Sequence, residues 1–396
     1  MAANGRNRAR RARPGLVVTV IAVAVVLLTG CDWSQLRAGP AGTGYTAGES
    51  TIGPGNVSTL VARWSRGVSW VGPSSPSPSP LARAGDALVV ASPGHSRVLD
   101  AATGAVRHVI GGAGDHGVAV DGGRVIITGD APTPGSLVSS FDLATAAPQW
   151  SNQAEFSATA PVVADGVIYV NSEGTVGTHP SIIWAYRESD GTKLWSTGGC
   201  CGLDAPGVAN GAMYFTQNLQ GAPNLLRALD AKTGAPRWSV PAPTRCPLQT
   251  SPVVSGGRLY VSGATFDAAT GAHLWDWPVC AGSNLASVSP TTVYVPYRPT
   301  PTTSALEAFD AATGAVKWSI PWGENARAAP SAPAVANGLL FAADGSRLIA
   351  ADAGTGARLW KSSAGTGVYD DPIVADGFVD VMNTDGRVRA FTLPSS

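Results

Sequence analysis

The chain has 396 residues, with 27 Lys and Arg against 27 Asp and Glu, 14% charged residues and 44% hydrophobic residues. Without residues 1–30, which hold five Arg and no acid, the balance is 22 basic against 27 acidic residues. This disfavours a nucleic acid partner, whose phosphates need a surface with an excess of Lys and Arg. The 48 Gly and 30 Pro argue against a helical bundle, and the apolar residues that recur along the chain argue against disorder.

The amino-terminal residues have the pattern of an export signal. Five Arg within 6–13 precede an apolar run over 16–28, which is too short for a membrane span and typical of a signal peptide. The run ends in Leu-Thr-Gly before Cys31 and resembles a bacterial lipobox, in which the Cys receives a lipid; the alternative is an ordinary secretory signal. We expect a lipoprotein signal peptide at 1–30, lipidation at Cys31, and a tether and lead-in segment at 31–57.

From residue 58 onward, one sequence motif recurs, which we call the phrase. It consists of a short apolar strand, an Asp, two or three small residues, Thr-Gly, and a strand that ends in Trp. Complete copies run over 229–238, 266–275, 309–318 and 351–360, and a copy at 99–104 lacks the Trp. Two copies have decayed, since Ala146 replaces the Gly before Trp150, and Asp190-Gly191 replaces Thr-Gly before Trp195.

The Trp of this phrase sets the period of the repeat. It stands at positions 64, 108, 150, 195, 238, 275, 318 and 360, with His108 in place of one Trp, at intervals of 37 to 45 residues. A period of this length with four short strands is typical of a β-propeller blade. Within one period we expect strands at 160–163, 167–170, 182–186 and 193–196, from the inner to the outer edge.

The ends of the repeat predict how the ring closes. Trp64 belongs to an outer strand with no blade before it, and the chain after residue 360 offers only three strands, at 372–375, 378–382 and 387–393. A strand at 60–65 is expected to complete that last blade and to remove its exposed edge. The predicted fold over residues 58–396 is therefore all-β: an eight-bladed β-propeller of four-stranded blades, closed by an N-terminal outer strand.

The residues of the phrase have structural tasks. The Asp accepts hydrogen bonds from backbone N–H groups of a turn, Thr does the same more weakly, and Gly supplies the positive φ that a tight hairpin needs. The Trp lies on the outer strand, where its ring can fill the gap between neighbouring blades. Because such Asp residues recur once per blade, a catalytic role for them is disfavoured.

The phrase resembles the PQQ-like β-propeller repeat, Ala-Leu-Asp-x-x-Thr-Gly-x-x-x-Trp, and the match covers roughly residues 58–393. A lipobox followed by eight such blades is similar to the propeller lipoprotein of the β-barrel assembly machinery. The resemblance implies a lipid-anchored, non-catalytic binding or assembly scaffold on the extracytoplasmic face of the cell membrane. An envelope protein or a cell-wall glycan would be its partner, and it would contact the membrane only through its lipid.

The alternative is a PQQ-dependent quinoprotein dehydrogenase that oxidises an alcohol or a sugar. Enzymes of that class resemble this fold, hold PQQ with Ca²⁺, and carry an adjacent Cys-Cys disulfide, which Cys200-Cys201 matches. The chain lacks their long insertions and a recognisable set of Glu, Asn and Asp ligands. It also has no GxSxG or HExxH motif. We therefore expect no catalytic residue, no metal site and no cofactor, and a monomer.

Four cysteines follow outer-strand Trp positions and fall in equivalent loops of successive blades: Cys200, Cys201, Cys246 and Cys280. In an exported protein they predict two disulfides. One pairing joins Cys200 to Cys201 and Cys246 to Cys280. The other two tie Cys246 and Cys280 separately to the adjacent pair. The spacing leaves all three pairings open. Disulfides that link neighbouring blades are favoured over a disulfide that covers a quinone.

The funnel face, defined as the face that carries the connections between blades, is where propellers usually bind partners. Its loops supply mainly acids and amides, which suit a tricarboxylate such as PQQ poorly. Two groups are the better binding candidates: Glu324, Asn325 and Arg327 in one loop, and Asp370 with Asp371 in another. For any single residue, a solvated turn is the competing interpretation.

Overall fold

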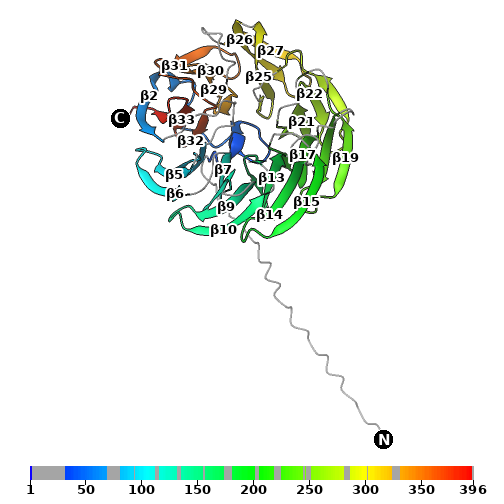
Figure 1. Cartoon of the computed structure of the whole chain (residues 1–396). Coiled ribbons are helices and arrows are strands. Elements are labelled where there is room, and N and C mark those ends of the chain that lie inside the picture. The colour runs from blue at the N-terminus through cyan, green and yellow to red at the C-terminus, as the bar shows by residue number, and fades with distance from the viewer. Residues whose placement is uncertain are drawn as a thin grey trace.

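The computed structural model describes residues 1, 32–68, 81–92, 94–111, 116–131, 135–154, 157–173, 181–200, 205–217, 224–243, 246, 251–280, 286–300, 302–322 and 331–394. These residues form eight antiparallel blades of four strands around a central axis (Figure 1). The first strands of neighbouring blades contact one another around this axis. The prediction of an eight-bladed propeller is confirmed.

The strands of each blade follow one another in chain order from the axis outward. Blade 1 contains β3 (Leu81–Ala84), β4 (Ala87–Val90), β5 (His95–Asp100) and β6 (Val106–Gly111), and blade 2 contains β7 (Gly117–Asp121), β8 (Arg124–Asp130), β9 (Ser136–Asp142) and β10 (Pro148–Ala154). Blade 3 contains β12 (Val162–Ala164), β13 (Val167–Glu173), β14 (Ser181–Arg187) and β15 (Lys193–Cys200), with β11 (Ser157–Ala158) also paired to β13. Blade 4 contains β16 (Gly207–Ala209), β17 (Ala212–Gln217), β18 (Leu225–Asp230) and β19 (Pro236–Pro241).

Blade 5 contains β20 (Val253–Ser255), β21 (Arg258–Val261), β22 (Ala264–Asp267) and β23 (His273–Asp276), and blade 6 contains β24 (Ser287–Val288), β25 (Thr292–Thr300), β26 (Thr303–Asp310) and β27 (Val316–Pro321). Blade 7 contains β28 (Ala334–Ala336), β29 (Leu339–Asp344), β30 (Arg347–Asp352) and β31 (Arg358–Lys361). Blade 8 contains β32 (Ile373–Ala375), β33 (Phe378–Asn383), β34 (Arg387–Thr392) and, from the other end of the chain, β2 (Val61–Gly67).

Strand β2 closes the ring as predicted. It pairs antiparallel with β34, with Val61 opposite Thr392 and Gly67 opposite Arg387. A buried ion pair seals the contact between blade 8 and blade 1, because Arg83 Nη1 lies 2.8 Å from Asp380 Oδ2 and both side chains are at most 3% exposed. A shared hydrophobic core runs across the same contact. The two ends of the propeller are therefore joined without a covalent link.

We call the contact between two neighbouring blades a seam. At the seam of blades 8 and 1, the Trp64 ring lies on Gly104, where an added Cβ would be 2.6 Å from the ring. Five other seams repeat this arrangement: Trp150 on Gly191, Trp195 on Gly234, Trp238 on Gly271, Trp275 on Gly314 and Trp318 on Gly356. The predicted place of Trp between blades is confirmed, and the structure adds that the ring packs on the turn glycine of the next blade.

The turn between the third and fourth strands has the predicted chemistry. In blade 1, Asp100 Oδ1 accepts hydrogen bonds from the backbone N–H of Thr103 at 2.9 Å and from its hydroxyl at 2.7 Å. Gly104 has φ 68° and its N–H donates to the Asp100 carbonyl at 2.8 Å. These Thr103 bonds, together with Arg107, hold the pKa of Asp100 at about 2. The face that carries these turns and those between first and second strands is called the turn face, and it lies opposite the funnel face.

Two short 3₁₀ helices, η1 (Leu36–Ala38) and η2 (Val57–Thr59), and strand β1 (Tyr45–Thr46) precede the first complete blade. Strand β1 adds to blade 7 in parallel with β28. Among the residues that the structure describes, no helix is both long enough and apolar enough to cross a membrane.

Candidate functional site

Residues 33–44, called the axial segment, run around the centre of the propeller, where Figure 1 shows them in blue. The segment forms hydrogen bonds with the first strands of seven blades, one after another. Each bond lies close to the β-turn that ends the strand. Trp33 exchanges backbone hydrogen bonds with Arg83, and Gln35 exchanges side-chain bonds with the backbone of Val163. Its carbonyls also accept hydrogen bonds from the backbone N–H groups of Val120, Val208, Val254, Val288 and Val335.

Blade 8 is tied to the chain just after this segment, because Glu49 Oε2 accepts a hydrogen bond from the Gly377 N–H at 2.9 Å. Residues 33–49 thus bond seven inner strands and the turn that follows the eighth. The tight course depends on small residues: at Gly44, with φ 60°, an added Cβ would lie 2.6 Å from Ser287 Oγ and 3.0 Å from the Pro333 carbonyl. The axis is therefore closed at the turn face by the chain itself.

Arg37 projects from the axial segment toward the funnel face. Its Nε donates to the Gly42 carbonyl at 2.9 Å, and Nη2 donates to the Ala286 carbonyl and to Ser287 Oγ. The residue has φ 58°, a left-handed conformation that is costly for a side chain of this size. Burial lowers the pKa of its guanidinium to about 10, and the carboxylate of Asp371 opposes that shift. Its Nη1 is buried without a hydrogen-bond partner in the protein.

Asp370 and Asp371 precede β32 on the funnel face. Asp371 Oδ1 accepts a hydrogen bond from the Ala332 N–H at 2.6 Å, and Asp370 Oδ1 accepts one from the Asp371 N–H at 2.8 Å. Burial and the neighbouring carboxylate raise the pKa of Asp370 to about 8, and burial raises that of Asp371 to about 6 although Arg37 opposes it. The pair therefore holds protons more readily than free carboxyl groups do, and its ionised form attracts a cationic group.

Arg37 and the acid pair belong to one site. Ser287, which accepts a hydrogen bond from Arg37, donates its own hydroxyl to the Pro333 carbonyl, and the preceding Ala332 binds Asp371. Sequence reasoning selected Asp370 and Asp371 but missed Arg37. The sequence offered no signal for it, because Arg37 lies in the predicted lead-in and meets blade 8 only through residues of blades 6 and 7.

The other predicted site residues are placed only in part. Cys31, Cys201, Glu324, Asn325 and Arg327 lie outside the described residues, and Cys200 ends β15 with its side chain outside them. Their roles stay predictions. Within the described ranges, no three His, Cys, Asp or Glu side chains cluster in a way that could hold a metal ion.

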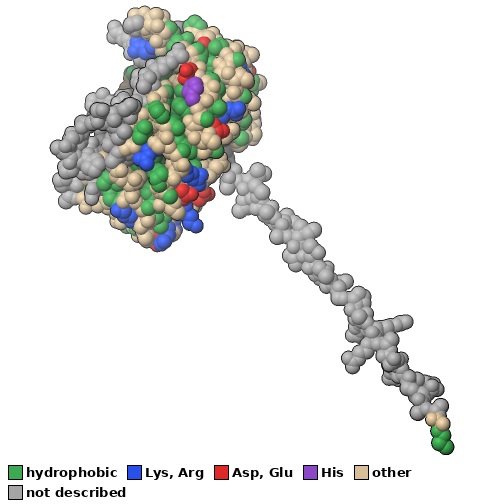
Figure 2. Space-filling view, turned by 90° about the vertical axis from the view of Figure 1, so that its right-hand side faces the viewer, with side chains coloured by type: hydrophobic (Ala, Val, Ile, Leu, Met, Phe, Trp, Pro, Cys, Tyr) green, Lys and Arg blue, Asp and Glu red, His purple; other side chains and the backbone are tan. Residues whose placement is uncertain are grey.

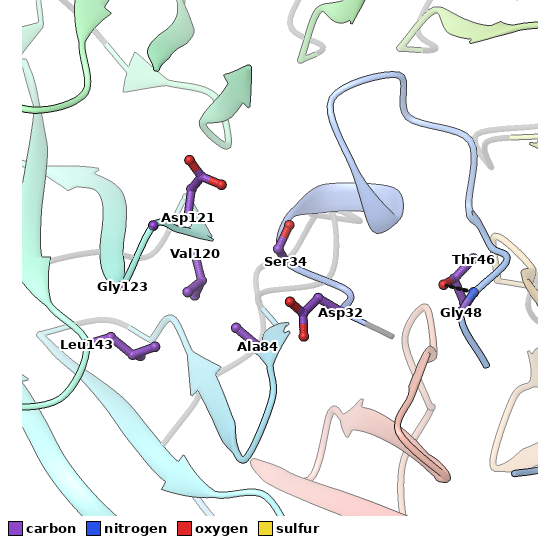
Figure 3. Close-up of a pocket in the computed structure, with 10 residues that line it drawn as sticks. Asp32, Ser34, Thr46, Gly48, Ala84, Val120, Asp121, Gly123 and Leu143 are labelled. Atoms are coloured by element: carbon purple, nitrogen blue, oxygen red, sulfur yellow. Dashed lines mark hydrogen bonds between the residues drawn. The ribbon is translucent and has the colours of Figure 1, made fainter. Parts of the chain in front are cut away.

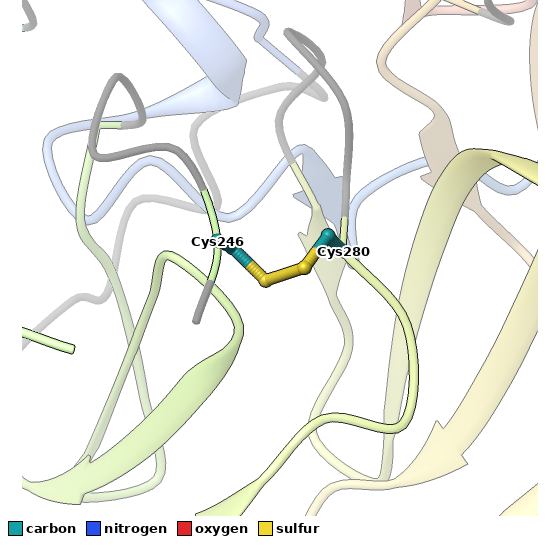
Figure 4. The surroundings of a disulfide bond; sticks show 2 residues. All are labelled: Cys246 and Cys280. Carbon is teal, nitrogen blue, oxygen red and sulfur yellow. A yellow bond between two sulfur atoms is a disulfide. The ribbon is translucent and has the colours of Figure 1, made fainter. Parts of the chain in front are cut away.

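A disulfide joins Cys246 to Cys280, with an S–S distance of 2.01 Å (Figure 4). It links the connections that follow blades 4 and 5 on the funnel face. Of the three pairings left open by the sequence, this bond is compatible only with the one that pairs Cys200 with Cys201. The bond lies over a two-residue turn of blade 5, where a Cβ on Gly263 would be 2.3 Å from Cys246 Sγ. Blade 5 has the shortest interval of the repeat, and its short turn leaves room for the bond.

A concavity of about 530 Å³ lies at the turn face, beside the start of the axial segment (Figure 3). Asp32, Ser34 and Thr46 line one part, and Asp121 and Leu143 of blade 2 line another. Burial and Asp121 raise the pKa of the nearby Glu188 to about 6. The pocket was not predicted, because its two halves are far apart in the sequence and meet only through the axial segment.

The fold has many solved neighbours of low identity. A europium-containing methanol dehydrogenase matches with a TM-score of 0.74 and 16% identity over 92% of this chain and 98% of its own. The quinohemoprotein alcohol dehydrogenase of Comamonas testosteroni gives 0.73 and 16% over 92% and 82%. BamB of Moraxella catarrhalis gives 0.65 and 17% over 85% and 98%. These likenesses show a shared fold and do not choose between an enzyme and a scaffold.

A search of curated proteins finds no significant match to the sequence. The family model described as outer membrane protein assembly factor BamB matches residues 96–201, 181–298 and 302–394, which together span well over half of the chain. This match follows the same repeat that builds the blades. The chain therefore belongs to the BamB family of PQQ-like β-propeller repeat proteins.

Proposed function

We propose that this protein is a non-catalytic binding scaffold of the cell envelope, held on the extracytoplasmic face of the membrane by a lipid on Cys31. Two observations support the location: the lipobox-like end of the apolar run, and a family named for an outer-membrane assembly factor. In this proposal residues 1–30 are removed as a signal peptide, and the partner is an envelope protein or a cell-wall glycan.

The observation that carries the proposal is the closure of the axis by residues 33–49. Because these residues occupy the inner strands at the turn face, the funnel face is the end at which a partner can approach the axis. Asp370 and Asp371 lie on that face with Arg37 beneath them. A partner that presents a Lys or Arg side chain, or the amino group of a glycan, would match the charge of this pair.

The described residues of the axis fit the quinoprotein alternative poorly. PQQ carries three carboxylates, and these would face the two acids of Asp370 and Asp371. Arg37 offers only one nitrogen without a partner, the buried Nη1, since its Nε and Nη2 already donate to protein oxygens. Asp370 and Asp371 each use one carboxylate oxygen to accept a backbone N–H. We therefore derive no reaction step through a quinone.

Crosslinking in cells, followed by identification of the captured protein or glycan, tests the scaffold. We expect a reproducible partner that is lost in the double variant Asp370→Asn with Asp371→Asn. Asp165→Asn is the control, because it makes the same Asp-to-Asn exchange once at a turn-face position whose φ of 51° Asn adopts readily. Capture that is equal in the wild type and the double variant would contradict the proposed site.

The acid pair also predicts a pH dependence. A cation binds the ionised carboxylates, and the raised pKa values of about 8 and about 6 mean that ionisation is completed only as the pH rises. The affinity for a short oligolysine peptide should therefore increase from pH 5 to pH 8, with release of protons on binding. The Asp-to-Asn double variant should bind weakly at every pH, and a rise that persists in it would implicate other groups.

Addition of PQQ and Ca²⁺ to the purified protein separates the two classes of function. We expect no stoichiometric uptake of PQQ and no dye-linked oxidation of alcohols or sugars. Uptake together with such oxidation would overturn the scaffold and establish the quinoprotein.

A further inference from the structure

We infer that the turn face of the propeller is held against the bilayer, so that the funnel face with its acid pair points away from the membrane toward the cell wall. The inference rests on the proposed lipid at Cys31. It adds an orientation and limits the partner to one that the outward face can reach.

The chain is fixed to the propeller immediately after Cys31. Asp32 Oδ1 accepts a hydrogen bond from the Gly85 N–H at 2.8 Å. Trp33 N–H donates to the Arg83 carbonyl at 3.0 Å, and Arg83 N–H donates to the Trp33 carbonyl at 2.8 Å. Cys31 is joined to Asp32 by a single peptide bond. A lipid on Cys31 therefore has almost no linker between it and the folded domain.

This attachment point belongs to the turn face. Gly85 is in the turn between the first and second strands of blade 1, and Asp32 lines the concavity of Figure 3 together with Asp121, Gly122 and Leu143. Asp121 and Gly122 lie at the corresponding turn of blade 2, and Leu143 lies in the turn between its third and fourth strands. The lipid would thus leave the propeller at the level of these turns, beside the axis.

The charge of the turn face argues that the lipid alone holds it to the membrane. Six turns carry an Asp that binds its own Thr through Oδ1: Asp100, Asp142, Asp230, Asp267, Asp310 and Asp352. The Thr bonds lower the pKa of Asp100 and Asp142, and Arg237 together with Thr233 lowers that of Asp230. Ionised carboxylates are repelled by anionic lipid headgroups. Three of the six, Asp100, Asp230 and Asp310, are also paired with Arg107, Arg237 and Lys317 of the same face. Acidic and basic side chains likewise lie interspersed on the side of the propeller that Figure 2 shows. Charge therefore gives the turn face no strong attraction to the bilayer, and the short attachment is what keeps it close.

The test compares heights above the membrane in the full-length, lipidated protein. A fluorophore is placed bioorthogonally at Lys232, an exposed turn-face position, or at Thr302, an exposed position between β25 and β26 on the funnel face. The acceptor is a headgroup dye in phosphatidylcholine vesicles with about one quarter phosphatidylglycerol. Because strands of six residues rise about 20 Å, we expect energy transfer from Lys232 to be at least about twice that from Thr302.

A Gly-Ser insertion of about ten residues after Cys31 is the matched control, since it adds about 17 Å of flexible reach. The difference between the two sites should shrink strongly in this variant. Equal transfer from both sites in the wild type, or greater transfer from Thr302, would overturn the orientation. An unchanged difference in the insertion variant would also overturn it, because the anchor would then not set the orientation.

Flotation with the vesicles separates this inference from the proposed function. Wild type that floats while Cys31→Ala does not, together with a lipid mass on the N-terminal peptide, supports the anchor on which the inference rests. Wild type that fails to float, or Cys31→Ala that floats equally, overturns the anchor and the inference with it. Flotation through Cys31 with Thr302 nearer the lipid overturns the orientation alone.

Discussion

The two seams on either side of blade 1 are built differently. At the seam with blade 8, the Trp64 ring lies on Gly104 and its Nε1 donates to the Ala101 carbonyl at 3.0 Å. Arg66 Nε adds a bond to the Gly104 carbonyl at 2.8 Å. At the seam with blade 2, His108 stands at the Trp position and Ala146 at the glycine position.

The second seam nevertheless keeps the turn. The Ala146 N–H donates to the Asp142 carbonyl at 2.8 Å, as the Gly104 N–H does to Asp100, and φ of Ala146 is 57°. Blades 1 and 2 also share a hydrophobic core, as blades 8 and 1 do. The two departures from the repeat thus fall at one seam. The comparison teaches that the glycine serves the Trp of the preceding blade as well as its own turn, and that Ala occurs where that Trp is missing.

Deletion of residues 58–66 should have the largest effect, because it removes most of β2 and with it the Trp64 seam. Strand β34 then loses its outer partner and the last blade has an open edge, which favours aggregation. We expect loss of cooperative thermal unfolding and increased light scattering. Thermal unfolding like that of the wild type would show that the ring does not depend on this strand.

Breaking the buried ion pair at the same seam should have the second-largest effect on stability. Arg83→Met leaves Asp380 buried without its partner, and breaking such a pair costs about 3 to 5 kcal/mol. The double variant Arg83→Met with Asp380→Leu removes both charges and should regain most of that loss in denaturant unfolding. A single variant that unfolds within about 1 kcal/mol of the wild type would mean that the pair does not seal the ring.

Exchanges at the glycine positions compare the two seams directly. Gly104→Ala places a Cβ 2.6 Å from the Trp64 ring at a φ of 68°, and we expect it to destabilise by about 2 to 4 kcal/mol. Ala146→Gly removes the strain of an Ala in a left-handed conformation, but it also raises the conformational entropy of the unfolded chain. The two effects oppose each other, so the free energy of unfolding should change by less than about 1 kcal/mol. Equal effects in urea unfolding would refute the difference between the seams.

Restoring the Trp and the Gly at the seam of blades 1 and 2 should give the smallest effect on the free energy of unfolding. His108→Trp alone brings an indole onto the Cβ of Ala146, whereas His108→Trp with Ala146→Gly restores the combination found at six other seams. We expect a favourable coupling of about 0.5 to 2 kcal/mol in a double-mutant cycle. Additive effects of the two changes would show that the residues do not meet.

Much of the fold could be predicted because the repeat is local and regular. The Thr-Gly turn, the period of the Trp and the missing fourth strand after residue 360 determine the blades and their closure. Predicted and observed strands agree to within a few residues, for example 182–186 against Ser181–Arg187. The frequency of the phrase could reveal the blade count, but it could not reveal which residue of the next blade each Trp packs on.

The site was harder to predict because its parts are not repeated. The axial segment has no periodic pattern, and its partners are backbone groups of seven inner strands, which leave no mark on the sequence around residues 33–44. Asp370 and Asp371 could be selected as an acid pair on a loop, but Arg37 could not. The bond of Cys246 with Cys280 depends on the short turn at Gly263, whose place beside these loops only the folded chain shows.

The closure of the ring has a consequence for the time course of folding. Glu49 bonds Gly377, Trp360 donates to the carbonyl of Leu60, and Arg387 binds Ser65, at sequence separations of 328, 300 and 322 residues. The first part of the propeller to be synthesised therefore finds the last of its partners only when the end of the chain exists. Contacts of such separation slow folding and leave strand edges unpaired meanwhile. A growing chain can form blades one by one, but the ring and its axis are completed only in a final step.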